Sequence, residues 1–300
     1  MEILFAKVLP IIIYFTLGII ARRTAIATAE QGGFLIKLAM YYTLPALFLI
    51  TFSKIHITTD LLFLPLSGIF VSLAVGLIAF SIGKYKRYDR KAMGSLLVGS
   101  MAMNSAFAFP FALVFFGPEA LTFALLYDLG NALMIFTVVY AIAFYYGDND
   151  LKGKKIINNI IRAPFLWTIF IALFMSFMEI HIPDILHEPF NALGNMTAPV
   201  LLMGMGISFA PARSHVAPAT EIIILRMLGG LSAILLVFMM IDIEDKQQIA
   251  MLMCAASPLG MTASAYSILA GLNTQTLISA ASISILLGLA WLPFLAYFYM

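Results

Sequence analysis

The sequence predicts an all-α integral membrane protein with ten transmembrane helices. Three observations support this. First, 62% of the 300 residues are hydrophobic and only 11% are charged, more apolar surface than a water-soluble domain could bury. Second, identical residues recur 154 positions apart. Third, polar interruptions divide two apolar segments at corresponding places. Five spans in each copy is an odd number, so the second copy is inverted relative to the first, giving a 5+5 inverted repeat.

The repeat keeps a constant register. Pro45 recurs as Pro199, and the interruption MAMNSAF, which contains Asn104, falls on AASPLGM, which contains Pro258. The other repeated pairs are Pro10 and Pro164, Thr43 and Thr197, Gly76 and Gly230, Gly117 and Gly271, Thr122 and Thr276, and Leu133 and Leu287. The pairs predict a first repeat at 1–146, a linker at 147–162 and a second repeat at 163–300.

A membrane-spanning helix needs about 20 apolar residues. The first such segment could be a signal peptide, since Ala27-Thr28-Ala29 is like a cleavage site, but Arg22 and Arg23 follow the apolar stretch instead of preceding it. We therefore expect a retained span. The ten predicted spans are 3–21, 33–53, 61–83, 92–116, 119–146, 163–180, 191–209, 216–241, 247–270 and 275–299.

Basic residues gather on one side of these spans. The opposite side has only Lys7, Lys54 and Lys246. This asymmetry predicts a plasma-membrane protein with both termini outside and the linker in the cytoplasm. We attribute the basic face to topology, with recognition of lipid headgroups as the alternative. The basic residues after spans 1, 3, 5 and 7 are Arg22, Arg23, Lys84, Lys86, Arg87, Arg90, Lys91, Lys152, Lys154, Lys155, Arg162 and Arg213.

Spans 4 and 9 contain the interruptions. In span 4, Ser100, Asn104 and Ser105 precede Pro110, which predicts a break around 104–109 because proline cannot continue the helical hydrogen bonding. In inverted halves the two breaks meet near the bilayer midplane, where free N–H groups at helix N-termini favour an anion. The alternative is that Pro110 and Pro258 are packing kinks. The predicted substrate-binding residues are Asn104, Ser105, Ser257, Thr262 and Tyr266.

Asp128 is the one carboxylate squarely within a predicted span, and Asn131 follows it on the same helical face. A buried acid is costly, so it indicates function or structural support. Three roles remain open: a proton carrier, a cation ligand, or an acid that holds the broken backbone of span 4. Lys37 and Arg226 lie near cytoplasmic span ends, where we expect them to snorkel to the interface. The histidines share no helical face, so we expect no metal site. We read the single cysteine, Cys254, as a packing residue, and we expect no cofactor and no nucleic-acid partner.

Four segments resemble the auxin efflux carrier family, whose bacterial members include dicarboxylate permeases. They are YTLPALFLITFSK, LGNMTAPVLLMGMGIS, FPFALVFFGPEALTFALLYDLGN and the stretch from SPLGMTASAY to the last span. The resemblance implies a fold related to bile-acid symporters and sodium/proton antiporters, and a homodimer. Spans 1, 2, 6 and 7 would form a scaffold, and spans 3–5 and 8–10 a mobile transport domain. Asn104, Pro110 and Pro258 match the crossover positions, and Asn104 would help hold a carboxylate. The gap from Asn104 to Pro110 is one residue shorter than the family pattern, and the central loop is short.

The expected function is transport of a small organic anion, such as a carboxylate, dicarboxylate or auxin-like acid, by an elevator-type alternating-access mechanism. H⁺ and Na⁺ are the candidate coupling ions. The alternatives are a sodium/proton-type antiporter, which usually needs a pair of carboxylates near the crossing, and a membrane sensor that does not transport. An intramembrane enzyme is disfavoured, because the spans contain no paired acids and no histidine.

Overall fold

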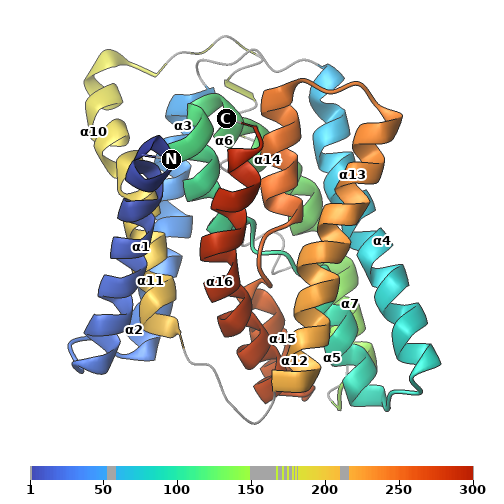
Figure 1. Cartoon of the computed structure of the whole chain (residues 1–300). Helices are drawn as coiled ribbons and strands as arrows, with labels where there is room; N and C mark the ends of the chain where they lie inside the picture. The colour runs from blue at the N-terminus through green and yellow to red at the C-terminus, as the bar shows by residue number, and fades with distance from the viewer. Residues whose placement is uncertain are drawn as a thin grey trace. The chain divides into compact units, whose positions relative to one another are not determined.

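The computed structural model describes residues 2–52, 59–148, 182–209 and 216–299, with a few residues between 167 and 180 (Figure 1). All regular elements within these ranges are helices. Most of the predicted linker 147–162 and of the predicted span 163–180 lies outside the described residues. The chain divides into two compact units. Unit 1 is Met1–Leu61, Phe109–Thr122 and Ile161–Phe209, and unit 2 is Leu62–Ala108, Phe123–Ile160 and Ala210–Met300.

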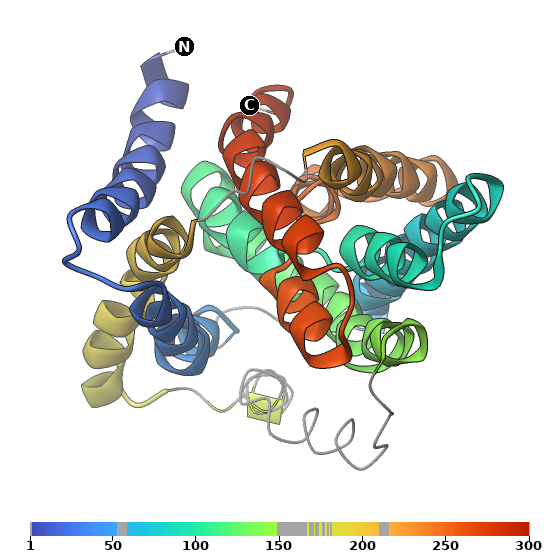
Figure 2. The ribbon, with the colours of Figure 1, turned by 90° about the horizontal axis from the view of Figure 1, so that it is seen from below.

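Unit 1 contains α1 (Glu2–Arg23), α2 (Ala29–Leu38), the π-helical turn η1 (Ala39–Thr43), α3 (Leu44–Phe52), α10 (Asp184–Asn195) and α11 (Thr197–Ser208). Figure 2 shows α11 between α1 and α2, and both pairs are in contact. Glycine permits this approach: a Cβ on Gly18 would lie 2.3 Å from the Met203 carbonyl oxygen, and one on Gly206 would lie 2.1 Å from that of Phe15. Thr28 and Gln31 form a capping box that starts α2.

Unit 2 is built mainly from helices that follow the 3₁₀ turn η2 (Thr59–Leu62). Pairs of helices in it recur at the 154-residue offset: α4 corresponds to the run from α12 to α13, and α5 corresponds to α14. The helices are α4 (Phe63–Tyr85), α5 (Arg90–Met101), η3 (Ile135–Val139), α7 (Tyr140–Tyr146), α12 (Val216–Ile224), η5 (Leu225–Gly229), α13 (Gly230–Met240), α14 (Asp245–Ala255), α15 (Met261–Ala270) and α16 (Thr274–Tyr297).

Helix α6 (Ser105–Met134) runs through both units and is broken at Gly117, whose φ of 83° and ψ of −176° are not helical. A proline, Pro118, begins the second half, a position that tolerates its missing N–H. Gly271, 154 residues after Gly117, also has a positive φ of 78° and ends α15. Two half-helices therefore stop at glycines in equivalent positions of the repeat.

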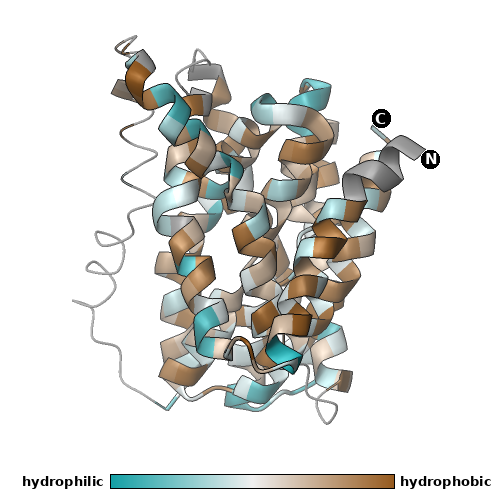
Figure 3. Ribbon diagram, turned by 90° about the vertical axis from the view of Figure 1, so that its left-hand side faces the viewer, coloured by the Kyte–Doolittle hydropathy of each residue, from teal (hydrophilic) through white to brown (hydrophobic). Residues whose placement is uncertain are grey.

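Five helices in the described part of the chain are long and apolar enough to cross a membrane, and hydrophobic residues dominate the helices in Figure 3. Two of the ten predicted spans are shortened because the break divides them, leaving α5 with 12 residues and α14 with 11. The structure therefore supports a helical multi-pass membrane protein. The five helices are Phe63–Tyr85, Ser105–Tyr146, Ile185–Ser208, Val216–Met240 and Thr274–Tyr297.

Candidate functional site: the crossing of two interrupted helices

The two polar interruptions are real breaks in the helices, and they meet. Helix α5 ends at Met101 before α6 begins at Ser105, and α14 ends at Ala255 before α15 begins at Met261. Between them, Met103 and Leu259 form an antiparallel bridge. The structure thus brings the segments 102–104 and 256–260 together inside unit 2, as the sequence predicts.

Backbone hydrogen bonds hold this crossing. The Asn104 N–H donates to the Pro258 carbonyl oxygen at 2.9 Å, and the Gly260 N–H donates to that of Ala102 at 2.7 Å. Because proline has no N–H, Pro258 cannot return the bond to Asn104. Irregular backbone at membrane depth requires such internal partners. The short antiparallel pairing therefore satisfies polar groups that a continuous helix would otherwise have satisfied.

Helix α16 supports the crossing from one side. The Ser284 hydroxyl accepts a hydrogen bond from the Leu259 N–H at 3.1 Å and donates one to the Ala281 carbonyl at 2.9 Å. A Cβ on Gly288 would lie 2.5 Å from Cγ of Pro258, so only glycine fits there without displacement. Sequence reasoning missed both residues. Their one signal was a serine and a glycine within an apolar span.

The position of the break corrects the role expected for Pro110. We expected the interruption at 104–109, caused by this proline, but α6 is already helical from Ser105 and contains Pro110. The helix begins where it does because Asn104 caps it: Oδ1 of Asn104 accepts a hydrogen bond from the Phe107 N–H at 3.2 Å. Cross-chain pairing and the asparagine cap, rather than Pro110, set the end of the break.

Asn104 is buried, with 7% of its surface exposed, and it keeps a free donor. Its Oδ1 is used in the cap, while Nδ2 has no hydrogen-bond partner in the described structure. A buried polar atom without a partner costs about 1–3 kcal/mol, so it marks a place where a ligand can supply the missing bond. The buried hydroxyl oxygens of Ser257, Thr262 and Ser264 are unpaired in the same sense.

Helix N-termini add to the polarity of this site. Gly260 caps α15 in an extended conformation, and a Cβ on it would be 3.0 Å from the Met103 carbonyl and 3.2 Å from the Thr262 hydroxyl. Both α6 and α15 therefore begin at the crossing, and their first N–H groups carry partial positive charge. Such an arrangement favours an anion held by neutral donors.

Tyr266, which we expected to bind substrate, has a packing position. Its buried ring meets the ring of Tyr140 edge to face, with centroids 5.3 Å apart and planes at 90°. Edge-to-face pairs of this kind stabilise helix packing. Tyr266 thus joins α15 to α7.

Asp128 belongs to a buried network of three side chains. Its Oδ1 accepts a hydrogen bond of 2.6 Å from Nδ2 of Asn131, and the same amide group donates to the Ser105 hydroxyl at 3.2 Å. Ser105 is the first residue of α6 after the break, so the network ties the distal half of α6 to the crossing. The Asn131 Oδ1 atom is buried and unpaired, which leaves an acceptor for a proton donor or a cation. The three roles considered for Asp128 remain open.

Arg226 does not snorkel to the interface, and that expectation was wrong. The side chain is fully buried: Nη1 donates to the Ser100 carbonyl at 3.1 Å and Nη2 donates to the Ala255 carbonyl. These carbonyls belong to the last turns of α5 and α14, the negative ends of the two half-helices. Room for the guanidinium comes from Gly230, whose Cβ would lie 2.3 Å from Nη2. The Gly229-Gly230 pair after Arg226 was the available sequence signal.

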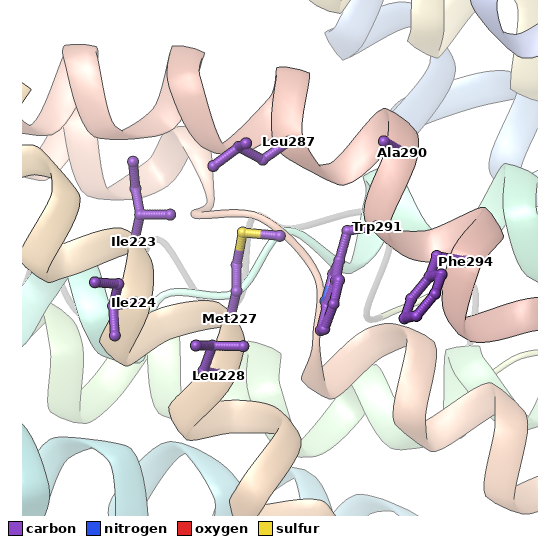
Figure 4. A pocket seen from close by; sticks show the side chains of 8 residues that line it. All are labelled: Ile223, Ile224, Met227, Leu228, Leu287, Ala290, Trp291 and Phe294. Atoms are coloured by element: carbon purple, nitrogen blue, oxygen red, sulfur yellow. The ribbon is translucent and has the colours of Figure 1, made fainter.

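An apolar groove elsewhere in unit 2 is a poor candidate for an anion. It lies between the α12–η5 run and α16 and has a cavity volume of about 610 Å³ (Figure 4). Apart from the indole nitrogen of Trp291, its lining side chains are apolar: Ile223, Ile224, Met227, Leu228, Leu287, Ala290 and Phe294. Among the described residues, no group of three or more His, Cys, Asp or Glu could hold a metal ion.

Interrupted apolar helices that cross through paired backbone define the class of integral membrane transport proteins. Residues 3–296 match the family described as membrane transport protein, and the chain belongs to this family, that of the auxin efflux carriers. It is 28% identical over 214 residues to an uncharacterized transporter of Methanocaldococcus jannaschii, covering 68% of each chain. It is 23% identical over 226 residues to an uncharacterized transporter of Methanothermobacter thermautotrophicus, covering 74% of each.

Proposed function

We propose that this membrane transporter carries a small organic anion, most simply a carboxylate, which binds at the crossing. The observation that carries the proposal is the buried, unpaired Nδ2 donor of Asn104 at the start of α6. A carboxylate oxygen would supply the acceptor that this donor lacks. The hydroxyls of Ser257 and Thr262 and the N-terminus of α15 would complete a shell without a fixed positive charge.

Arg226 supports this electrostatic arrangement. A half-helix that ends at the crossing brings a negative C-terminus close to the positive N-terminus of the next. The Arg226 guanidinium binds carbonyls at both C-termini, one from α5 and one from α14. An anion at the crossing would therefore interact with the N-termini of α6 and α15 while the opposing dipole ends are already neutralised.

The proposed architecture is a 5+5 inverted repeat of ten spans, with a pseudo-twofold axis in the membrane plane. Helix bounds support it: α5 (Arg90–Met101) shifted by 154 residues ends with α14 at Ala255, and α4 shifted in the same way falls within Val216–Met240. The equivalent glycines at the half-helix ends support it as well. Both termini would lie outside the plasma membrane.

The division into units suggests how the transporter would move. The entire crossing, with Asp128 and Arg226, belongs to unit 2, and α1, α2 and α11 belong to unit 1. Unit 2 would act as the transport domain and unit 1 as the scaffold, so that the bound anion is carried past the scaffold in an elevator-type cycle. Phe109–Thr122 is the exception, since this part of α6 clusters with unit 1. We further propose a homodimer formed through the scaffold.

Transport in proteoliposomes tests the function. The full chain is reconstituted and uptake of labelled monocarboxylates, dicarboxylates and indole acids is measured at two pH values, with and without sodium. We expect saturable uptake of one of these classes, which Asn104→Ala abolishes while the protein remains folded by thermal unfolding. The matched control is Asn273→Ala, because Asn273 also caps a helix, α16, but makes no side-chain cap bond.

Three results would contradict the proposal. Sodium-dependent proton flux without any organic anion would indicate a cation antiporter. Binding without flux of any kind would indicate a sensor. Unchanged uptake in Asn104→Ala would remove Asn104 from the site. A proton-coupled cycle would show uptake driven by an imposed pH gradient, and a matching loss in Asp128→Asn would assign the proton to Asp128.

A further inference from the structure

A second cavity in unit 2 lies at the ends of three helices, far along the chain from the crossing segments. It has a volume of about 510 Å³ and lies where α4 ends, α5 begins and α7 ends. Its wall combines apolar and aromatic side chains, including Phe80, Met93 and Tyr145, with two cations, Lys84 and Arg90. A cavity with this composition suits a ligand that has both an anionic and an apolar part.

The two cations are held by aromatic rings and carry unneutralised charge. The Lys84 ammonium lies 5.7 Å from the centroid of Phe80. The Arg90 guanidinium lies 5.9 Å from the centroid of Tyr145 and donates to the Tyr145 carbonyl oxygen. Cation–π contacts fix the position of a charge without cancelling it. Within the described residues, neither Lys84 nor Arg90 takes part in an ion pair.

Neighbouring charges do not compete for these cations. Glu221 binds Lys86 at 2.9 Å and Asp148 binds Lys91 at 2.5 Å. Asp89 caps α5, where its carboxylate accepts a hydrogen bond of 2.7 Å from the Ala92 N–H. Each nearby acid therefore has a partner of its own. Positive charge remains at the cavity, and the N-terminus of α5 adds to it.

The position of the cavity along the spans selects the kind of anion. Tyr85 and Tyr145 at the same span ends are 89% and 66% exposed, as expected for aromatic side chains at a membrane interface. The loop charges predict that this interface is the cytoplasmic one. Phosphate groups of phospholipids lie at this depth, and anionic phospholipids are attracted by basic side chains at the surface.

We propose that this cavity binds an anionic phospholipid of the cytoplasmic leaflet. Lys84 and Arg90 contact the phosphate, and Phe80 and Met93 contact the start of an acyl chain. A soluble phosphate would use the cations but would leave the apolar wall uncovered. This inference depends on the geometry at the span ends and not on the transported substrate, so it stands or falls separately from the transport function.

Lipid binding to the purified full chain in detergent tests it. The probes are phosphatidylglycerol, phosphatidylcholine and inorganic phosphate, and the readouts are thermal unfolding and lipid retention in native mass spectrometry. Each basic side chain near a membrane surface contributes about fivefold to the attraction of an anionic lipid, so two predict a preference for phosphatidylglycerol of about thirtyfold. We expect Lys84→Gln and Arg90→Gln each to reduce this preference about fivefold, and Arg90→Lys to retain most of it.

Arg87→Gln is the matched control, because Arg87 is an exposed cation in the same loop that does not line the cavity. It should keep the full preference. Equal retention of the two lipids by the wild-type protein would overturn the proposal. So would an equal loss in Arg87→Gln, which would indicate general surface charge. Stabilisation by inorganic phosphate as large as that by phosphatidylglycerol would assign the cavity to a soluble anion instead.

Discussion

The hydroxyl of Thr197 donates a hydrogen bond of 3.0 Å to the hydroxyl of Thr43, and these two threonines are separated by the repeat offset of 154 residues. The same offset separates Asn104 from Pro258, which are joined by a backbone hydrogen bond. In a molecule with twofold pseudo-symmetry, a residue can contact its own equivalent only on the axis. Each unit therefore contains one such self-contact, α11 with η1 in unit 1 and the crossing in unit 2. Both contacts support the proposed inverted repeat.

Valine substitutions should show an unequal effect at this threonine pair. Thr43 also donates to the Ala39 carbonyl at 3.3 Å, so it keeps a partner when Thr197 is changed. Thr197→Val should therefore cost about 1 kcal/mol, whereas Thr43→Val leaves the buried Thr197 hydroxyl unpaired and should cost up to about 3 kcal/mol. The double variant should cost less than the sum of the two. Unfolding in mixed detergent measures these values, and strict additivity would show that the contact is not energetically coupled.

The two half-helix glycines should respond differently to asparagine. Gly271 has φ of 78° and ψ of 34°, the left-handed region that asparagine tolerates. Gly117 has φ of 83° and ψ of −176°, a region open essentially to glycine alone. We expect Gly271→Asn to be nearly neutral and Gly117→Asn to cost about 1–3 kcal/mol of stability. No atoms crowd a Cβ at Gly117, so backbone strain alone would account for the loss. Equal melting temperatures for both variants would contradict this explanation.

An aspartate at position 104 should separate folding from anion binding. Aspartate caps a helix as well as asparagine does, because either side chain accepts the Phe107 N–H. It lacks the Nδ2 donor, however, and adds a negative charge where the anion would bind. Asn104→Asp should retain the melting temperature within a few degrees and lose anion uptake more completely than Asn104→Ser. Uptake equal to that of Asn104→Ser would exclude a role for charge at this position.

The sequence predicts the crossing because proline, glycine and asparagine interrupt two apolar segments at the same register, and these residue types act locally on the backbone. The location of the break was less accurate. Pro110 suggested an interruption several residues too late, because the hydrogen bonds that end the break come from a segment more than 150 residues away. Arg226 was misread for a related reason: its nearness to a span end is visible in the sequence, but the two carbonyls that it binds are brought together only by the fold.

Alkaline pH should weaken the contact between the α4–α5 loop and α12. Lys86 donates to Glu221, which raises the pKa of Lys86 above its usual 10.5, and burial raises the pKa of Tyr88, which donates to the same carboxylate at 2.5 Å. Both protonated forms are favoured in the folded state. Their stabilisation is present below about pH 10 and is lost as the pH rises through the raised values. Wild type should exceed Lys86→Gln in melting temperature at pH 7 and pH 9, and the difference should disappear above pH 11. A difference that persists at high pH would point to packing rather than charge.

The repeat also predicts a way to relocate the buried arginine. Ser72 of α4 is the equivalent of Arg226, and its hydroxyl is buried and unpaired. Helix α4 reaches the end of α5, because a Cβ on Gly76 would lie 2.7 Å from the sulfur of Met101. If pseudo-symmetry relates the two positions, an arginine at 72 faces the same pair of half-helix ends from the opposite side.

Arg226→Met leaves the Ser100 and Ala255 carbonyls without their donor and should cost about 2–4 kcal/mol, with weaker anion uptake. Arg226→Lys should retain part of both properties, since an ammonium can reach one carbonyl but cannot bridge two as the guanidinium does. The double change Ser72→Arg with Arg226→Ser should recover stability and apparent anion affinity relative to Arg226→Ser alone. Recovery of stability without affinity would limit Arg226 to a structural role, and no recovery of either would show that the two positions are not equivalent.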